Sequence, residues 1–137
     1  MSKMKVLFLD DNKRRHHRFF EMNSDLSRKH VYNAEDCLAA LRDNDTKYDI
    51  IFLDHDLDER TNNILVDDEK DGRFVAKNMA GLDIATKYRG TVIVIHSLST
   101  LGAQAMSEIL KDGGYTKVFI HPFVWESHVR SLTNNWV

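Results

Sequence analysis

Residues 6–11 read VLFLDD and residues 50–56 read IIFLDHD, and these two stretches decide the fold. Each is a short apolar run that ends abruptly in aspartate. Two later stretches have the same form: VIVIHS at residues 92–97 and VFIHP at residues 118–122. Continuous apolar runs of this length are typical of strands buried on both faces, as in a parallel sheet covered by helices. A weaker run at residues 30–32 indicates a fifth strand.

Amphipathic helical patterns lie between these strands. The clearest has one apolar face with the spacing i, i+3, i+4, i+7, formed by Ala34, Cys37, Leu38 and Leu41. A second face precedes two glycines that suit a helix end, and comprises Met106, Ile109 and Leu110. A final short helix is outlined by Trp125, Val129, Leu132 and Trp136. The sequence therefore predicts a βα unit repeated five times, an α/β protein with a doubly wound parallel sheet.

Length and composition fit one soluble domain spanning residues 1–137. Lys and Arg total 19 against 21 Asp and Glu, so no positive field favours binding to duplex nucleic acid. The single cysteine, Cys37, cannot form an internal disulfide, which favours a reducing cytoplasm. The apolar run near the N-terminus is too short for a signal peptide or a membrane span, so we expect no membrane partner.

One segment does not fit the strand and helix pattern. The stretch at about 57–71 is polar and carries seven Asp, Glu, Lys or Arg side chains before Asp71. We expect it to form a loop over the functional site. An ordinary surface insertion explains the composition equally well.

Three aspartates follow the first and third strands: Asp10, Asp11 and Asp54. The carboxyl ends of parallel strands meet at one edge of the sheet, so these side chains should converge. Carboxylates, with a backbone carbonyl near Asp56, are ligands that Mg²⁺ prefers, and Mn²⁺ is a second option. Alternatively, Asp10 or Asp11 only caps the following helix.

Three histidines follow the third, fourth and fifth strands: His55, His96 and His121. Imidazole titrates near neutral pH, so one ring can take a proton from water while another gives one to a leaving oxygen. Such a pair suits phosphodiester cleavage. A lone histidine at a strand end is usually a hydrogen-bonded structural residue, but three at equivalent positions beside three aspartates favour a functional role.

Hydroxyl and basic side chains supply candidate phosphate contacts at two helix starts. Ser97, Ser99 and Thr100 precede the helix after the fourth strand, where free N–H groups favour an anion, although one of them can be an ordinary cap. Arg15 and His16 lie in the basic run at residues 13–18, which is otherwise typical of a solvated helix face.

In order and spacing these residues resemble a response-regulator receiver domain along nearly the whole chain. The match comprises Asp10-Asp11, Asp54, Asp71-Gly72, Ser97 and Pro122. The resemblance implies strand order 2-1-3-4-5, a phospho-accepting Asp54, and Mg²⁺ at the three aspartates with the carbonyl of Asp56. The chain departs from receivers at His121, where they have lysine, and at His55 and His96.

The chain more closely resembles the receiver-derived family named for cyclic-phosphate processing. That family has LFLDD with a following Arg-His, DHDL, an HS-x-N stretch followed by Gly-Ala, and Pro-Phe. The matching residues here are Asp10, Asp11, Arg15, His16, Asp54, His55, Asp56, Leu57, His96, Ser97, Gly102, Ala103, Pro122 and Phe123, with Ser99 in place of the asparagine. The resemblance implies a phosphate contact at Ser97, Ser99, Gly102 and Ala103.

Three functions are open at this point. The first is a metal-dependent phosphoesterase that acts on a cyclic nucleotide or an RNA-end cyclic phosphate, with His55, His96, His121 and Asp54 as catalytic residues. The second is a phospho-accepting signalling domain that uses Asp54 as nucleophile. The third is a module that binds a nucleotide without turnover. All three have a small phosphate-containing ligand as partner.

Overall fold

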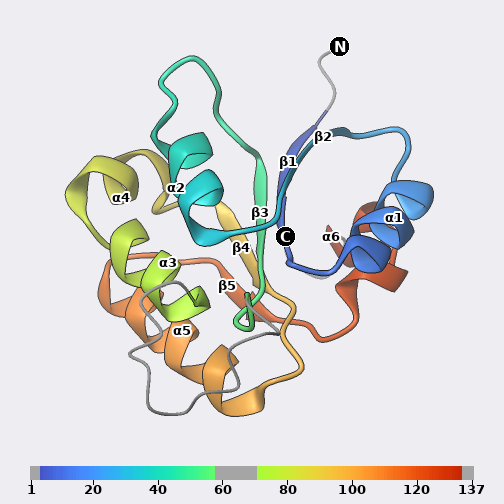
Figure 1. The fold of residues 1–137 in the computed structure, drawn as a ribbon. Coiled ribbons are helices and arrows are strands. Elements are labelled where there is room, and N and C mark those ends of the chain that lie inside the picture. The colour runs from blue at the N-terminus through green and yellow to red at the C-terminus, as the bar shows by residue number, and fades with distance from the viewer. Residues whose placement is uncertain (1–3, 58–70, 134–137) are drawn as a thin grey trace.

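The computed structural model describes residues 4–57 and 71–133. Nearly all of the predicted loop at about 57–71, and Trp136 of the predicted final helix, lie outside these residues. Five parallel strands form one sheet in the order β2-β1-β3-β4-β5 (Figure 1). The strands are β1 (Lys5–Leu9), β2 (Ser27–Val31), β3 (Ile50–Leu53), β4 (Val92–Ile95) and β5 (Val118–Ile120).

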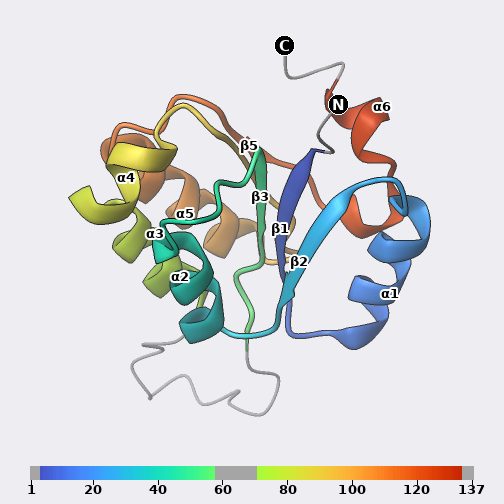
Figure 2. The same cartoon turned by 90° about the horizontal axis from the view of Figure 1, so that it is seen from above.

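Helices cover both faces of the sheet (Figure 2). One face carries α2 (Ala34–Arg42), α3 (Gly72–Met79), α4 (Leu82–Tyr88) and α5 (Thr100–Asp112). The other carries α1 (Lys13–Met22), the short 3₁₀ helix η1 (Val124–Glu126) and α6 (Val129–Thr133). Within the described ranges, no helix is long and apolar enough to cross a membrane.

Alternate residues of each strand point into two separate apolar cores, as the strand period of two requires. In β1, Leu7 and Leu9 pack under α2 to α5, whereas Val6 and Phe8 pack under α1, η1 and α6. Because both faces are buried, the strands have no polar side and appear as continuous apolar runs.

The predicted fold class and strand order are confirmed, and two details differ. The segment between β3 and β4 forms two helices instead of one, because the chain becomes extended at Gly81 (ψ 150°), which ends α3 and starts α4. Strand β2 begins at Ser27 and ends at Val31, whereas the prediction was 30–32. As an edge strand it alternates between exposed and partly buried positions, so its apolar run is short.

A buried asparagine joins α1 to the C-terminal helices. The side chain of Asn23 donates to the carbonyls of Phe19 and Ser127 and accepts from the N–H of Val129 at 2.7 Å. These bonds hold η1 and α6 against α1.

Replacing this asparagine is expected to loosen that packing. Asn23→Ala should lower the free energy of unfolding by about 2–4 kcal/mol, since it leaves the Val129 N–H and the Ser127 carbonyl without partners. Urea unfolding measures the change. Asn44→Ala, at an exposed turn position, is the matched control and should change stability by less than about 0.5 kcal/mol. Equal stabilities of the two variants would contradict the assignment.

Candidate functional site

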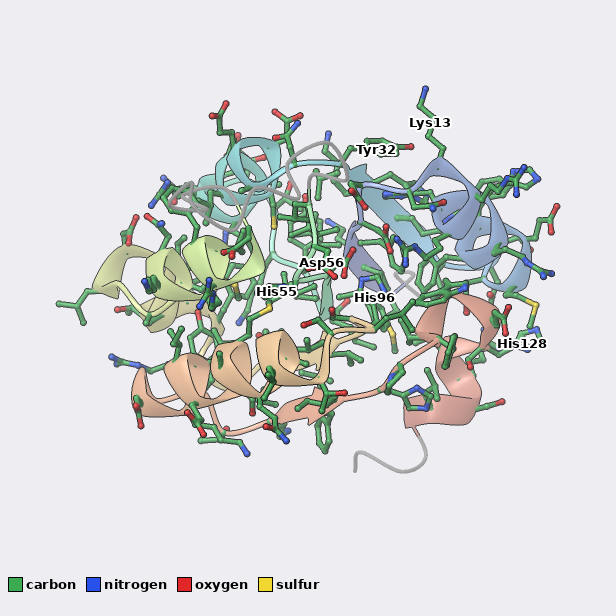
Figure 3. All side chains as sticks on the ribbon, turned by 60° about the horizontal axis from the view of Figure 1, so that its bottom comes forward. Lys13, Tyr32, His55, Asp56, His96 and His128 are labelled. Carbon is green, nitrogen blue, oxygen red and sulfur yellow. The ribbon has the colours of Figure 1, made fainter. Side chains whose placement is uncertain are left out.

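The candidate site lies where β1, β3 and β4 end. Asp10, Asp54 and His96 directly follow these strands, and all three side chains are buried. Figure 3 looks toward this edge of the sheet and shows His55, Asp56 and His96 near its centre. The parallel arrangement therefore brings together residues that are far apart in the sequence.

Asp10, Asp11 and Asp54 form one carboxylate cluster. Each offers an oxygen that lies within 4.8 Å of the other two, and among residues 4–57 and 71–133 this is the one such group of His, Cys, Asp or Glu side chains. Oδ2 of Asp54 is buried and accepts no hydrogen bond, and Oδ2 of Asp10 is buried with an ion pair to Arg15 as its contact. This donor set fits a divalent cation, because carboxylate oxygens without hydrogen-bond partners are what a hard cation requires.

The aspartates do not cap the following helix, so that alternative is wrong. Asn12 is the N-cap of α1, and its Oδ1 accepts from the N–H groups of Arg14 and Arg15. Oδ1 of Asp10 instead accepts from the N–H of Asn12 at 2.8 Å, which fixes the carboxylate orientation.

Arg15 forms ion pairs with two members of the cluster. Its Nε lies 3.1 Å from Oδ2 of Asp10, and its Nη2 lies 3.7 Å from Oδ1 of Asp11. The guanidinium carbon lies 5.0 Å from the ring centroid of Trp125, a cation–π contact. Arg15 is thereby held on one side by carboxylates and on the other by an indole ring.

Burial perturbs both inner carboxyl groups. Desolvation raises the pKa of Asp10 to about 7, although the Asn12 N–H and Arg15 oppose the rise. Desolvation, followed by repulsion from Asp10, raises the pKa of Asp54 to about 8, with Arg15 again opposing. One arginine does not offset three converging carboxylates, so the cluster favours a bound proton or an added cation at neutral pH.

This predicts a pH-dependent stability of the metal-free protein. The folded state binds protons that the unfolded state has lost above its pKa of 3.8, so the stabilisation is complete at low pH and disappears as pH rises through about 7 and 8. In EDTA, the free energy of unfolding should fall by roughly 2 kcal/mol between about pH 6.5 and 8.5, a window above the ordinary histidine titration. Urea unfolding at several pH values measures it.

The control variants separate this cluster from the rest of the chain. Asp54→Asn should roughly halve the decrease in the free energy of unfolding between about pH 6.5 and 8.5. Asp45→Asn, at an exposed turn, should leave this decrease unchanged. An unchanged decrease in Asp54→Asn would contradict the raised pKa of Asp54.

His55 lies beside the cluster with one ring nitrogen engaged and one without a hydrogen bond. Nδ1 lies 2.8 Å from Oδ1 of Asp56, and Nε2 is buried without a hydrogen-bond partner, 3.6 Å from Oδ2 of Asp71. In a neutral His55 ring, the contact with a carboxylate that only accepts would place the hydrogen on Nδ1 and the lone pair on Nε2. This is the arrangement of a histidine base and a carboxylate that orients it.

Two glycines make room for this ring and its backbone. A Cβ on Gly102 would lie 2.5 Å from the imidazole carbons of His55, and a Cβ on Gly72 would lie 2.5 Å from the Asp54 carbonyl oxygen. The start of α5 and the start of α3 can therefore approach His55 closely only without side chains.

His96 and His16 are buried next to Asp10 and contact it or its neighbour Leu9. His96 is fully buried, with Nε2 2.9 Å from the Leu9 carbonyl and Nδ1 3.7 Å from Oδ2 of Asp10. Both nitrogens of buried His16 are engaged, by the Asp10 carbonyl at 2.7 Å and by Nδ1 of His30 at 2.6 Å. His16 is therefore not free to contact a phosphate and instead holds the backbone of Asp10.

Desolvation keeps both rings neutral. It lowers the pKa of His16 to about 4 and the pKa of His96 to about 3. A neutral, buried ring is suited to positioning neighbours rather than to donating a proton at neutral pH.

Two of the predicted phosphate contacts at α5, Ser97 and Ser99, also take part in local capping bonds. Ser99 is the N-cap, and its Oγ accepts from the N–H of Gly102 at 3.2 Å, while the N–H of Ala103 donates to the Ser99 carbonyl. Oγ of buried Ser97 accepts from the N–H of Ser99. The N–H groups of Gly102 and Ala103 thus have partners, and Gly102 is needed here for the space that it leaves to His55.

His121 follows β5, and its Nδ1 lies 3.0 Å from the Pro122 carbonyl. The side chain of Asp56 bonds to His55 and lies outside the cluster of metal-ligating atoms found in the described residues. The ligand role predicted for its carbonyl stays a prediction.

Sequence reasoning missed two residues of this site. Asp71 was predicted only to start a helix, and this is correct, because its Oδ1 caps α3. The contact that the prediction missed is between its Oδ2 and the ring of His55. Trp125 was assigned to a helix face, but its ring contacts Arg15 and lies 6.0 Å from His96 between ring centroids. No local pattern links positions so distant in sequence.

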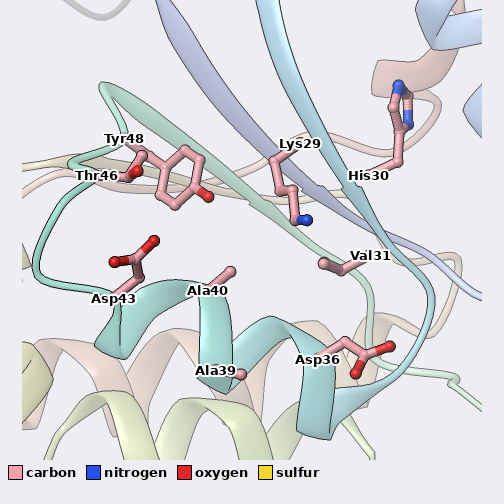
Figure 4. A pocket seen from close by; sticks show the side chains of 9 residues that line it. All are labelled: Lys29, His30, Val31, Asp36, Ala39, Ala40, Asp43, Thr46 and Tyr48. Carbon is pink, nitrogen blue, oxygen red and sulfur yellow. The ribbon is translucent and has the colours of Figure 1, made fainter.

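A separate pocket lies at the edge of the sheet, between β2 and α2 (Figure 4). Lys29, Asp36, Asp43 and Tyr48 line part of it, and none of the cluster aspartates does. Its two carboxylates make it a poor match for a phosphate ligand.

Fold and site together define a receiver-like protein. The structure resembles a receiver domain from Methanospirillum hungatei JF-1 (TM-score 0.65, 11% identity, 98% of this chain and 94% of the other) and the Francisella response regulator 1452 receiver domain (TM-score 0.61, 18% identity, 97% and 96%). It also resembles the Mn²⁺-bound form of response regulator Rcp1 (TM-score 0.56, 16% identity, 87% and 80%). At these identities the likeness shows the fold alone.

A family model supplies the more specific assignment. The model of the cyclic-phosphate processing receiver domain matches residues 5–112, so the chain belongs to that family, as the sequence motifs predicted. No curated protein matches the chain.

Proposed function

We propose that this protein is a metal-dependent phosphoesterase that opens a cyclic phosphate, carried by a nucleotide or by an RNA end. The observation that carries the proposal is the pairing of His55, whose Nδ1 contacts Asp56 and whose Nε2 has no hydrogen bond, with a carboxylate cluster in which Oδ2 of Asp54 has no hydrogen-bond partner. The family description, cyclic-phosphate processing, agrees with this chemistry.

Asp10, Asp11 and Asp54 would hold the divalent cation, Mg²⁺ or Mn²⁺. When bound, such a cation polarises a phosphoryl oxygen and offsets the charge that develops during hydrolysis. The raised pKa values of Asp10 and Asp54 support this assignment, since the buried carboxyl groups need a compensating positive charge.

His55 acts as the general base. Its Nε2 takes a proton from a water molecule, the water oxygen attacks phosphorus, and one ester bond of the ring breaks. Asp56 keeps the ring in the required tautomer, and Asp71, 3.6 Å from Nε2, stabilises the imidazolium that results. The leaving oxygen takes its proton from solvent.

Arg15 supplies the fixed positive charge that meets the phosphate. Its contacts with Asp10, Asp11 and Trp125 restrict the side chain, so a phosphoryl oxygen meets a preorganised guanidinium. His96 positions Asp10 from behind. His121 occupies the place of the receiver lysine and remains a candidate for charge stabilisation.

The test is hydrolysis of 2′,3′-cyclic AMP by the purified protein with Mg²⁺ or Mn²⁺, followed by chromatography of the products. We expect turnover that EDTA abolishes. His55→Ala should lower kcat by about 10²- to 10⁴-fold, the usual contribution of a general base.

His17→Ala is the matched control, because His17 is exposed and pairs only with Glu21 on the surface of α1; it should keep full turnover. Absence of turnover of 2′,3′- and 3′,5′-cyclic nucleotides with either metal would overturn the proposal. Tight binding with the cyclic ester recovered intact would instead support a nucleotide-binding module.

One observation favours a second function, phosphoryl acceptance at Asp54. This residue ends the central strand of the sheet, and its unpartnered Oδ2 lies next to Asp10 and Asp11. A carboxylate in that place can act as nucleophile toward a phosphodonor. The His121 position, which holds lysine in receivers, makes this the weaker candidate.

Acetyl phosphate with Mg²⁺ distinguishes the two functions. A phospho-accepting domain gains one phosphoryl group in its intact mass, and Asp54→Asn loses that gain. Under the phosphoesterase proposal, we expect mass spectrometry to find the protein unmodified.

A further inference from the structure

We propose that the exposed ring of Phe123 is a stacking surface for the heteroaromatic base of a nucleotide whose phosphate lies at the carboxylate cluster. The inference rests on the proposed function and deepens it, since it names a nucleotide base as part of the ligand. Three observations carry it: the backbone of Phe123, the exposure of its ring and its contact with Trp125, which also contacts Arg15.

The backbone of Phe123 adopts the left-handed conformation, with φ 62° and ψ 24°. It is the one non-glycine residue with positive φ in the described ranges. For an aromatic residue this conformation costs about 1–2 kcal/mol, and such costs are found mostly where a ligand or a reaction requires the geometry.

The strained conformation places an apolar ring in solvent. Phe123 is 51% exposed, whereas Trp125, two residues later, is 7% exposed. Folding alone gives no reason to combine backbone strain with an exposed phenyl ring, because burial of the ring would have favoured the folded state. The combination suggests that the ring contacts a ligand.

The position of Phe123 links it to the phosphate site. The chain from β5 to η1 runs along the edge where the strands end (Figure 1). The Phe123 ring meets the Trp125 ring edge to face at 5.2 Å between centroids, and Trp125 contacts Arg15, which pairs with Asp10. A single indole ring thus separates Phe123 from the guanidinium.

This geometry fits a nucleotide better than an isolated phosphate. The edge-to-face contact with Trp125 leaves at least one face of the Phe123 ring open, and every base has a π-face that can stack on such a ring. A phosphate beside Arg15 brings its attached base toward the Trp125 and Phe123 side. Stacking is tolerant of base identity, so we expect affinity for a base with little choice among bases.

The test compares two secondary phosphate monoesters, 3′-AMP and base-free glycerol 2-phosphate, neither of which contains a cyclic ester to cleave. Calorimetry with Mg²⁺ measures both dissociation constants. Phe123→Ala should raise the dissociation constant of 3′-AMP by roughly tenfold and change that of glycerol 2-phosphate by no more than about twofold. Phe123→Trp should keep the affinity for 3′-AMP.

Two further variants separate a ligand role from a structural one. Phe20→Ala removes another exposed aromatic ring, which belongs to α1 and contacts Arg28 of β2. It should not change either dissociation constant. Phe123→Gly should unfold at the parent temperature or above, since glycine tolerates the left-handed conformation, and should lose 3′-AMP affinity as Phe123→Ala does.

Equal effects of Phe123→Ala on both ligands, or no effect on 3′-AMP, would overturn the inference while the proposed function stands. Base-dependent binding without turnover of any cyclic nucleotide would support the stacking surface and reject the phosphoesterase. A parent protein that binds neither ligand would overturn the inference, whereas the proposed function is decided by turnover of the cyclic nucleotides.

Discussion

The convergence of Asp10, Asp11 and Asp54 is the constraint around which the rest of the site is arranged. Three carboxylates at the end of a buried sheet repel one another and lose hydration, which raises the pKa of Asp10 and of Asp54 well above the ordinary range. Arg15 offsets only part of this cost. Such a cluster favours a bound proton or a cation, and under the proposed function a cation held there, beside the Arg15 guanidinium and the His55 imidazole, would act on a phosphate ester.

The surrounding residues keep the cluster rigid. His96 and His16 lie behind it as neutral rings that hydrogen-bond the carbonyls of Leu9 and Asp10. In front, Gly102 leaves space for the ring of His55. Histidines that look alike in the sequence thus differ in their surroundings: both ring nitrogens of His16 are engaged, whereas His55 and His96 each have one ring nitrogen without a hydrogen bond.

Much of the fold was predictable because each strand has a local signature. The runs at 6–9, 50–53 and 92–95 are apolar on both faces, and that pattern requires a sheet covered by helices. The break at Gly81 and the early start of β2 were not predictable, since one depends on a single extended residue and the other on pairing with β1. For the site, aspartates and histidines at strand ends indicated the location, whereas Trp125, Asp71 and the strain at Phe123 had no local signal.

The sequence by itself determined the α/β fold, the family and the edge of the sheet at which the ionisable residues meet, because strand periodicity and parallel topology place strand ends together whatever the details. Only the tertiary structure decided how buried each of those residues is and which partners it has. Burial, hydrogen-bond partners and close backbone approaches separate His55 from His96 and His16, and Asp54 from Asp56. These properties arise from atoms that are distant in sequence, so they exist only after the chain has folded.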